Sequence, residues 1–102
     1  MKEVQTIGLQ DGKLRFVLSG EIDASDADEF FEIVATAYEK QPADIAFDCE
    51  NLEFIDSTTL GTFVKILKKA KTDGNALSLC GLQPKIKKLF LICALDKIME
   101  IA

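Results

Sequence analysis

NLEFIDSTTLG, residues 51–61, places three consecutive hydroxyl residues (57–59) where an apolar segment gives way to a helical pattern. Before this stretch, apolar residues alternate with the period of a half-buried strand: Ile45, Phe47 and Cys49. After it, apolar residues recur at the spacing of one helix face: Leu60, Phe63, Val64 and Leu67. The stretch therefore predicts a strand that passes directly into an amphipathic helix, with hydroxyl groups at the junction.

Toward the N-terminus, the pattern is that of a hairpin followed by a helix. Asp11 and Gly12 separate two apolar segments, and Asp-Gly between such segments is a strong signal for a two-residue hairpin turn. Asp23 or Ser25 is then expected to cap a helix, because side-chain oxygens accept the free amides of a first turn. That helix is expected to end before Pro42.

Toward the C-terminus, a strand is expected at 76–80 and an edge strand at 98–101, with a helix between them that begins near Pro84. The expected apolar stripe of that helix is Ile86, Leu89, Phe90 and Cys93. The complete order is β-β-α-β-α-β-α-β, which predicts an α/β fold with helices packed on a mixed sheet whose later strands are parallel. At 102 residues we expect a single domain, 1–102.

Composition excludes several classes of function. A net charge of −5 argues against nucleic acid, whose phosphates require clustered Lys and Arg. No stretch approaches the roughly 20 apolar residues that cross a bilayer, so no membrane insertion is expected. The three cysteines lie in apolar segments without metal-site spacing, which indicates buried thiols in a reducing cytoplasm. With no histidine and no phosphate-binding or nucleophile motif, we expect no catalytic residue, metal or cofactor.

Ser57 permits two interpretations. In the first, its side-chain oxygen only caps the following helix. In the second, Ser57 accepts a phosphate, which the positive end of a helix tolerates. Phosphate would add about 1.5–2 negative charges beside Asp56 and Glu53, and would break an interface without unfolding the domain.

Three stretches together resemble one family. FIDSTTLG (54–61) resembles the D-S-[ST]-G-L-G segment of STAS domains, in particular the bacterial anti-sigma-factor antagonists. LSGEID (18–23) is similar to the family's L-x-G-E-L-D segment before its first helix. LQPKIKKLF (82–90) resembles a later stretch in which a helix begins near Pro and runs to a Leu-Phe pair. Each motif is weak alone, but three in order make the resemblance fairly specific over nearly the whole chain.

The resemblance implies a phosphorylation-controlled binding protein. In the family, the serine after the motif aspartate is phosphorylated by an anti-sigma factor that is itself a serine kinase. The unphosphorylated antagonist binds that kinase and frees the sigma factor, and a PP2C-type phosphatase reverses the modification. By this resemblance Ser57 is the phosphoacceptor, and the partner-binding residues are Asp23, Asp56, Thr58 and Thr59.

Two residues depart from the family pattern. Thr59 stands where the family usually has Gly, which makes the helix start bulkier and could divert phosphate to Thr58. Ala94 stands where many relatives have Gly after the third helix.

Two other functions remain open at the level of sequence. One is a STAS subunit of a lipid transporter or larger signalling assembly, in which Ser57 is never phosphorylated. The other is an enzyme that uses Asp23, Asp56 and Ser57, although no base is available to activate the serine.

Overall fold

The computed structural model of the chain describes residues 2–102. Its strands are β1 (Lys2–Gln10), β2 (Lys13–Ile22), β3 (Asp44–Ile55), β4 (Leu77–Cys80) and β5 (Glu100–Ile101). They lie side by side in chain order; β1 is antiparallel to β2, and the remaining neighbours are parallel. The predicted mixed sheet with parallel later strands is therefore confirmed.

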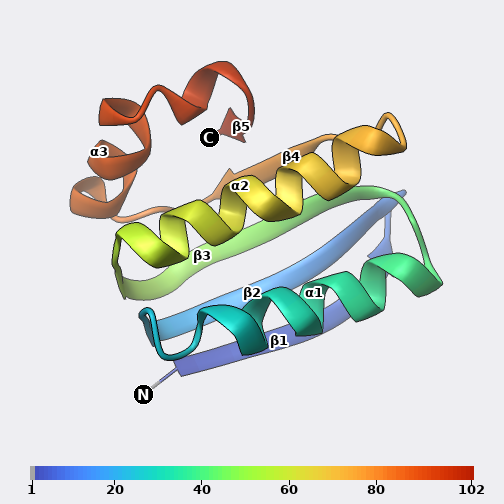
Figure 1. The fold of residues 1–102 in the computed structure, drawn as a ribbon, viewed down its shortest axis with the longest axis horizontal. Coiled ribbons are helices and arrows are strands. Elements are labelled where there is room, and N and C mark those ends of the chain that lie inside the picture. The colour runs from blue at the N-terminus through green and yellow to red at the C-terminus, as the bar shows by residue number, and fades with distance from the viewer. Residues whose placement is uncertain (1) are drawn as a thin grey trace.

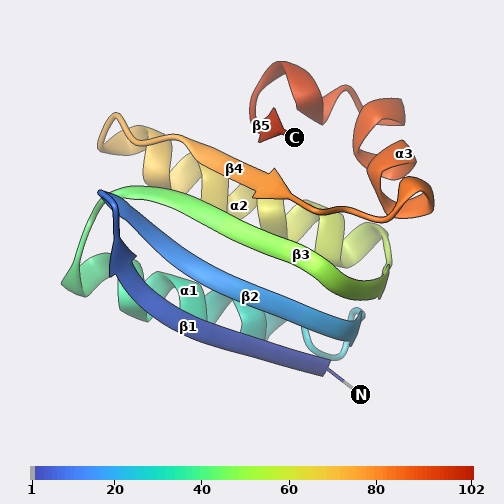
Figure 2. The same cartoon turned by 180° about the vertical axis from the view of Figure 1, so that it is seen from behind.

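The helices cover one face of this sheet. α1 (Ala27–Lys40) and α2 (Ser57–Thr72) run across that face, while α3 (Pro84–Ile92) and the short 3-10 helix η1 (Leu95–Lys97) lie toward β4 and β5 (Figure 1). From behind, Figure 2 shows the opposite face of the sheet with no helix over it. Within residues 2–102, no helix combines the length and apolar character needed to span a membrane.

The turn between β1 and β2 has the conformation that its sequence predicts. Asp11 (φ 54°) and Gly12 (φ 79°) are both left-handed. A two-residue turn of this kind matches the twist of the strands it joins, and Gly and Asp adopt it at low cost. The turn sets the pairing of Gln10 with Lys13, and with it the start of the β1–β2 register.

Five phenylalanines form a continuous series through the core between sheet and helices. All are fully or almost fully buried: Phe16, Phe30, Phe47, Phe63 and Phe90. Neighbouring rings lie between 5.2 and 5.9 Å apart, mostly edge to face, the preferred geometry of aromatic pairs. The series joins β2, β3 and the three helices, so the core fixes the helices relative to the sheet.

Two expectations about burial are wrong in part. In α3 only Ile86 and Phe90 are buried, whereas Leu89 is 40% exposed and Cys93 is exposed, because α3 lies at one end of the sheet and contacts it along a narrow face. Cys49 is buried as predicted, and burial raises the pKa of its thiol. Cys80 is exposed, because it lies on the sheet face that no helix covers.

Ala94, immediately after α3, is left-handed with φ 57°, a conformation that costs a residue with a Cβ about 1–2 kcal/mol. We expect Ala94→Gly to raise the free energy of unfolding by about 0.5–1 kcal/mol in urea titration, since glycine's greater freedom in the unfolded chain offsets part of the gain. Ala76→Gly, at an exposed position without positive φ, should lower the stability instead. Equal effects of the two substitutions would contradict this explanation.

Candidate functional site

The candidate site lies where β2 and β3 end. These strands are parallel neighbours, with Ile22 opposite Ile55, so the segments that follow them leave the same edge of the sheet. Residues 23–26 follow β2, and Asp56 and the first turn of α2 follow β3 (Figure 1). The parallel pairing therefore brings Asp23 and Asp56, which are 33 positions apart in the chain, to one place.

Asp56 is the N-cap of α2, and its carboxylate connects both segments. Oδ1 accepts the amide N–H of Thr59 at 2.9 Å, and Oδ2 accepts the amide N–H of Ala24 at 2.7 Å. The Thr59 amide hydrogen bond holds the pKa of the Asp56 carboxyl below its usual value, with smaller contributions from the Thr59 hydroxyl and the Ala24 amide. Asp56 is therefore ionised at neutral pH and tied to two elements.

Asp23 organises the turn before α1. Its Oδ1 accepts both the backbone amide of Ser25 at 2.9 Å and the Ser25 hydroxyl at 2.6 Å. The Ser25 hydroxyl bond is the largest cause that lowers the pKa of Asp23, while the charge of Asp56 acts in the opposite direction. The two carboxylates are thus near enough to interact.

The predicted cap of α1 by Asp23 or Ser25 is wrong. Asp26 is the N-cap, and its side chain accepts the amide of Asp23 rather than an amide of the helix. The reason is the additional turn formed by residues 23–26, closed by a bond from the Asp26 amide to the Asp23 carbonyl, which delays the start of the helix.

Ser57 and Thr58 are the first two residues of α2, and both are exposed. Because Asp56 supplies the cap, the interpretation that Ser57 merely caps the helix is wrong. Within residues 2–102 the Ser57 hydroxyl makes no hydrogen bond, so it is open to solvent and to another protein. Sequence could not decide this cap, because Asp and Ser are about equally good at the position.

Thr59 does not fit its expected place on a partner surface, because its exposed fraction is 0%. Its hydroxyl donates to the carbonyl of Ile22 at 2.8 Å and lies 3.0 Å from Oδ1 of Asp56. The side chain therefore connects the end of β2 to the start of α2. The Thr59 side chain, which stands where the family usually has Gly, therefore points into the protein and adds no bulk to a surface that a partner could contact.

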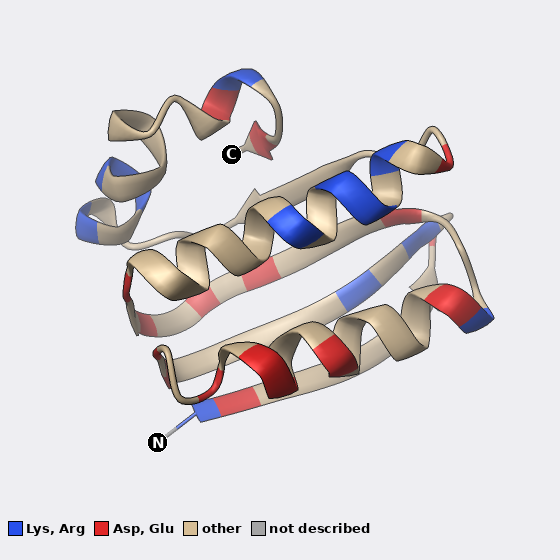
Figure 3. Ribbon diagram, viewed as in Figure 1, with Lys and Arg blue, Asp and Glu red and all other residues tan. Residues whose placement is uncertain are grey.

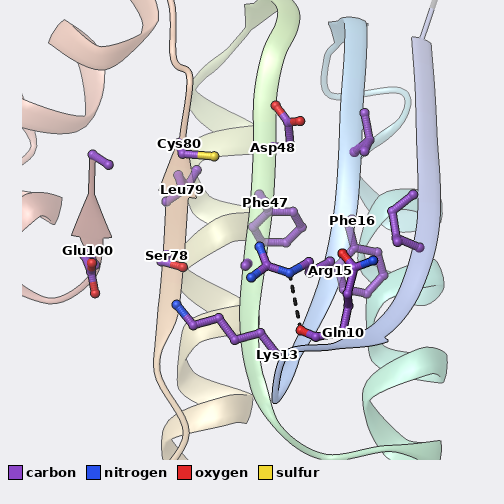
Figure 4. Close-up of a pocket in the computed structure, with 14 residues that line it drawn as sticks. Gln10, Lys13, Arg15, Phe16, Phe47, Asp48, Ser78, Leu79, Cys80 and Glu100 are labelled. Atoms are coloured by element: carbon purple, nitrogen blue, oxygen red, sulfur yellow. Dashed lines mark hydrogen bonds between the residues drawn. The ribbon is translucent and has the colours of Figure 1, made fainter.

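A separate cavity of about 480 Å³ lies on the uncovered face of the sheet (Figure 4). Lys13 and Arg15 enter it from β2, and Arg15 Nε donates to the carbonyl of Gln10 at 3.3 Å. Ser78 and Cys80 line it from β4. None of the residues predicted for the site lines this cavity, so it plays no part in the arrangement around Asp56.

Comparison with known proteins agrees with this architecture. Residues 3–102 match the family model described as STAS domain. An anti-sigma-B factor antagonist of Staphylococcus aureus is 30% identical over 92 residues, which is 90% of this chain and 85% of the relative. The chain belongs to the STAS domain family. The antagonist of Listeria monocytogenes is 33% identical over 84 residues, covering 82% of this chain and 74% of that protein.

Solved structures of STAS proteins share the fold. An anti-sigma factor antagonist from Mycobacterium paratuberculosis superposes with a TM-score of 0.86 at 19% identity, over 99% of this chain and 85% of that one. The phosphorylated form of the Bacillus protein SpoIIAA gives a TM-score of 0.73 at 19% identity, over 100% of this chain and 91% of that chain.

The carboxylates of this STAS site are used structurally. Asp56 accepts backbone amides with both oxygens, and Oδ1 of Asp23 accepts two hydrogen bonds from Ser25. Among residues 2–102, no group of three or more His, Cys, Asp or Glu side chains is placed to hold a metal ion. The arrangement can present a hydroxyl group beside fixed negative charge.

Two features of the site escaped prediction. One is the Ala24 amide, since no side-chain pattern marks a backbone donor. The other is Phe54, which is 44% exposed two residues before Asp56. Strand alternation offers a signal for it, because Phe54 and Ile55 are adjacent and only one of them can face the core.

The Thr59 hydroxyl can be tested by removing it with little change of shape. Thr59→Val leaves the Ile22 carbonyl without its buried donor, and we expect the free energy of unfolding to fall by about 1–3 kcal/mol. Thr59→Ser keeps the hydroxyl and should restore part of this loss in the same urea titration. If the valine variant is as stable as the wild type, the connection between β2 and α2 contributes nothing.

Asp56→Ala should lower the stability at pH 7 by about 1 kcal/mol, the usual cost of losing an N-cap. Because the folded pKa of Asp56 lies below the unfolded value, its contribution is complete above about pH 4 and is lost as the pH falls through the folded pKa. The difference between variant and wild type should therefore shrink in urea titrations below pH 4. Asp28→Ala, at an exposed aspartate in the first turn of α1, should change stability by less than about 0.5 kcal/mol.

Proposed function

We propose that this protein is an anti-sigma-factor antagonist whose unphosphorylated form binds a kinase-type anti-sigma factor and releases a sigma factor. The binding surface consists of residues 23–25 and the exposed start of α2 at Asp56–Thr58, with Phe54 beside it. Phosphate on Ser57 ends the binding. The names of the relatives support the class of partner, and the exposed Ser57 hydroxyl, uncommitted to any cap, is the observation that carries the switch.

The fold tolerates a phosphate at Ser57. Asp56 accepts the amide of Thr59, and the amide of Leu60 bonds to the Asp56 carbonyl, so the amides of Ser57 and Thr58 are left among those that a helix start does not satisfy. Unsatisfied amides and the helix dipole favour negative charge at this position. Modification would thus leave the domain folded.

The same phosphate opposes binding through charge. Asp56 is ionised and fixed next to Ser57, and Asp23 lies near Asp56. A phosphate adds about 1.5–2 negative charges to this group. When a partner covers the surface and excludes water, these like charges are no longer screened and binding is lost.

Catalysis of phosphate transfer belongs to the partner in this proposal. The kinase is the anti-sigma factor itself, a PP2C-type phosphatase removes the phosphate, and the three proteins meet in the cytoplasm. This division is supported by the Asp56 carboxylate next to Ser57, both of whose oxygens accept backbone amides.

Phosphorylation of Ser57 can be tested by incubating the protein with ATP and the kinase-type anti-sigma factor that is encoded nearest to its own gene. Intact mass spectrometry should show one added phosphate on the wild type and on Thr58→Ala, and none on Ser57→Ala. The PP2C-type phosphatase should remove it. A phosphate that persists in Ser57→Ala and disappears in Thr58→Ala would place the modification on Thr58 instead.

Binding of unmodified variants to the same kinase tests the charge mechanism. We expect Ser57→Asp to weaken the complex at least tenfold, about 1.4 kcal/mol, in titration calorimetry, while Ser57→Asn, of similar shape, stays within about threefold of the wild type. Equal affinity of Ser57→Asp and wild type would refute the mechanism. Stable co-purification with transporter subunits, whatever the residue at 57, would favour the transporter-subunit alternative.

A further inference from the structure

The outer edge of β1 is an unpaired sheet edge. β1 is a nine-residue strand that ends the sheet and pairs only with β2. In an antiparallel pair, alternate residues direct their N–H and C=O groups away from the partner strand, so β1 presents a row of them. Proteins protect such edges with charges, Pro or bulges. Residues 4–10 of β1 (VQTIGLQ) contain no charge and no Pro, and the protection they do have is the shift of register between Thr6 and Gly8.

A groove of about 540 Å³ runs along this edge between β1 and α1. Thr6 and Gly8 line it from the strand, and Ile33, Thr36 and Ala37 line it from the helix. Gly8 is left-handed (φ 101°) at a shift of register between Thr6 and Gly8, and a Cβ there would meet no atom within 4 Å. The missing side chain leaves the groove open beside the strand.

Apolar surface at this edge is not covered by the core. Leu9 pairs with Leu14 and so belongs to the helix-facing side of β1, yet it is 51% exposed, whereas Leu14 is buried. Ile33 on the facing side of α1 is also only partly buried. The helix layer therefore fills the space above β2 and leaves it unfilled above β1.

We propose that an extended segment of another protein adds to β1 as a sixth strand and places an apolar side chain in this groove. The strand's free backbone groups would supply the main-chain hydrogen bonds, and side chains at every second position of the added segment would face α1. The groove does not include Ser57, the first residue of α2, and α1 lies between α2 and β1 (Figure 1).

Charge determines the kind of segment that fits. The rim of the groove carries one acid, Glu32, and one base, Lys40. Further exposed acids, Asp28 and Glu29, lie toward the start of α1, so acids outnumber bases along the exposed side of that helix (Figure 3). Lys2 already pairs with Glu29 and Asp26. The complementary segment is therefore apolar at alternate positions and carries Lys or Arg where it passes Glu32.

A second copy of this chain is disfavoured by the same charges. Pairing β1 with its two-fold mate would bring two α1 helices side by side, each with a predominantly acidic exposed face, in a protein of net charge −5. Like charges placed together oppose association.

This site can be tested by NMR titration of the whole ¹⁵N-labelled protein with a synthetic peptide, Lys-Val-Thr-Val-Thr-Val-Lys. We expect saturable shifts of amide signals confined to β1 and the facing residues of α1. The same peptide with Glu in place of both Lys, or with alternate backbone nitrogens methylated, should bind at least tenfold more weakly. Thr36→Arg, which fills and charges the groove at an exposed helix position, should do the same.

Controls separate this site from the switch. Asn51→Arg, the same change of charge at an exposed position outside the groove, and Ser57→Asp should both leave peptide affinity within about twofold. Three results would overturn the proposal. They are the absence of amide shifts at millimolar peptide, amide shifts confined to other parts of the protein, and binding that survives both backbone methylation and Thr36→Arg. Sedimentation as a dimer with β1 amides protected from exchange would assign the edge to a second copy instead, and would likewise overturn it.

Discussion

The carboxylate of Asp56 is the interaction on which the arrangement of the site depends. It accepts one amide from its own helix and one from the segment after β2, so a single side chain both starts α2 and fixes the neighbouring loop. This double role is possible only because β2 and β3 are parallel neighbours that end at the same level of the sheet. Burial of Thr59 beneath the junction adds a second link, through the Ile22 carbonyl.

These links explain how one surface can be rigid and still expose a modifiable group. The residues that hold the junction, Asp56 and Thr59, direct their polar atoms toward backbone groups, while Ser57 and Thr58 between them face solvent. Asp56 faces inward because it caps the helix, and Thr59 faces inward because its hydroxyl binds the Ile22 carbonyl of β2. Charge added to Ser57 would therefore act on a partner rather than on the fold.

The two sides of the sheet differ in how far helices cover them. At the β4 side, α3 and η1 pack beside the sheet, and Phe90 joins the aromatic series of the core. At the β1 side, α1 covers only part of the strand, and the groove beside Gly8 remains. The aromatic core lies between the helices and strands β2 and β3, so the stability of the sheet does not depend on filling the space above β1.

Sequence alone determined the order of the elements, the hairpin at Asp11-Gly12 and the mixed sheet, because periodicity and turn chemistry are local properties. It also placed hydroxyl residues at the junction after β3. Only the tertiary structure decided which of them face solvent. Asp56 and Ser57 are equivalent as caps in sequence, and the Thr59 hydroxyl faces inward to donate to the Ile22 carbonyl, 37 positions away in the chain. Local patterns cannot contain that information, since it arises from the parallel pairing of strands separated by a whole helix.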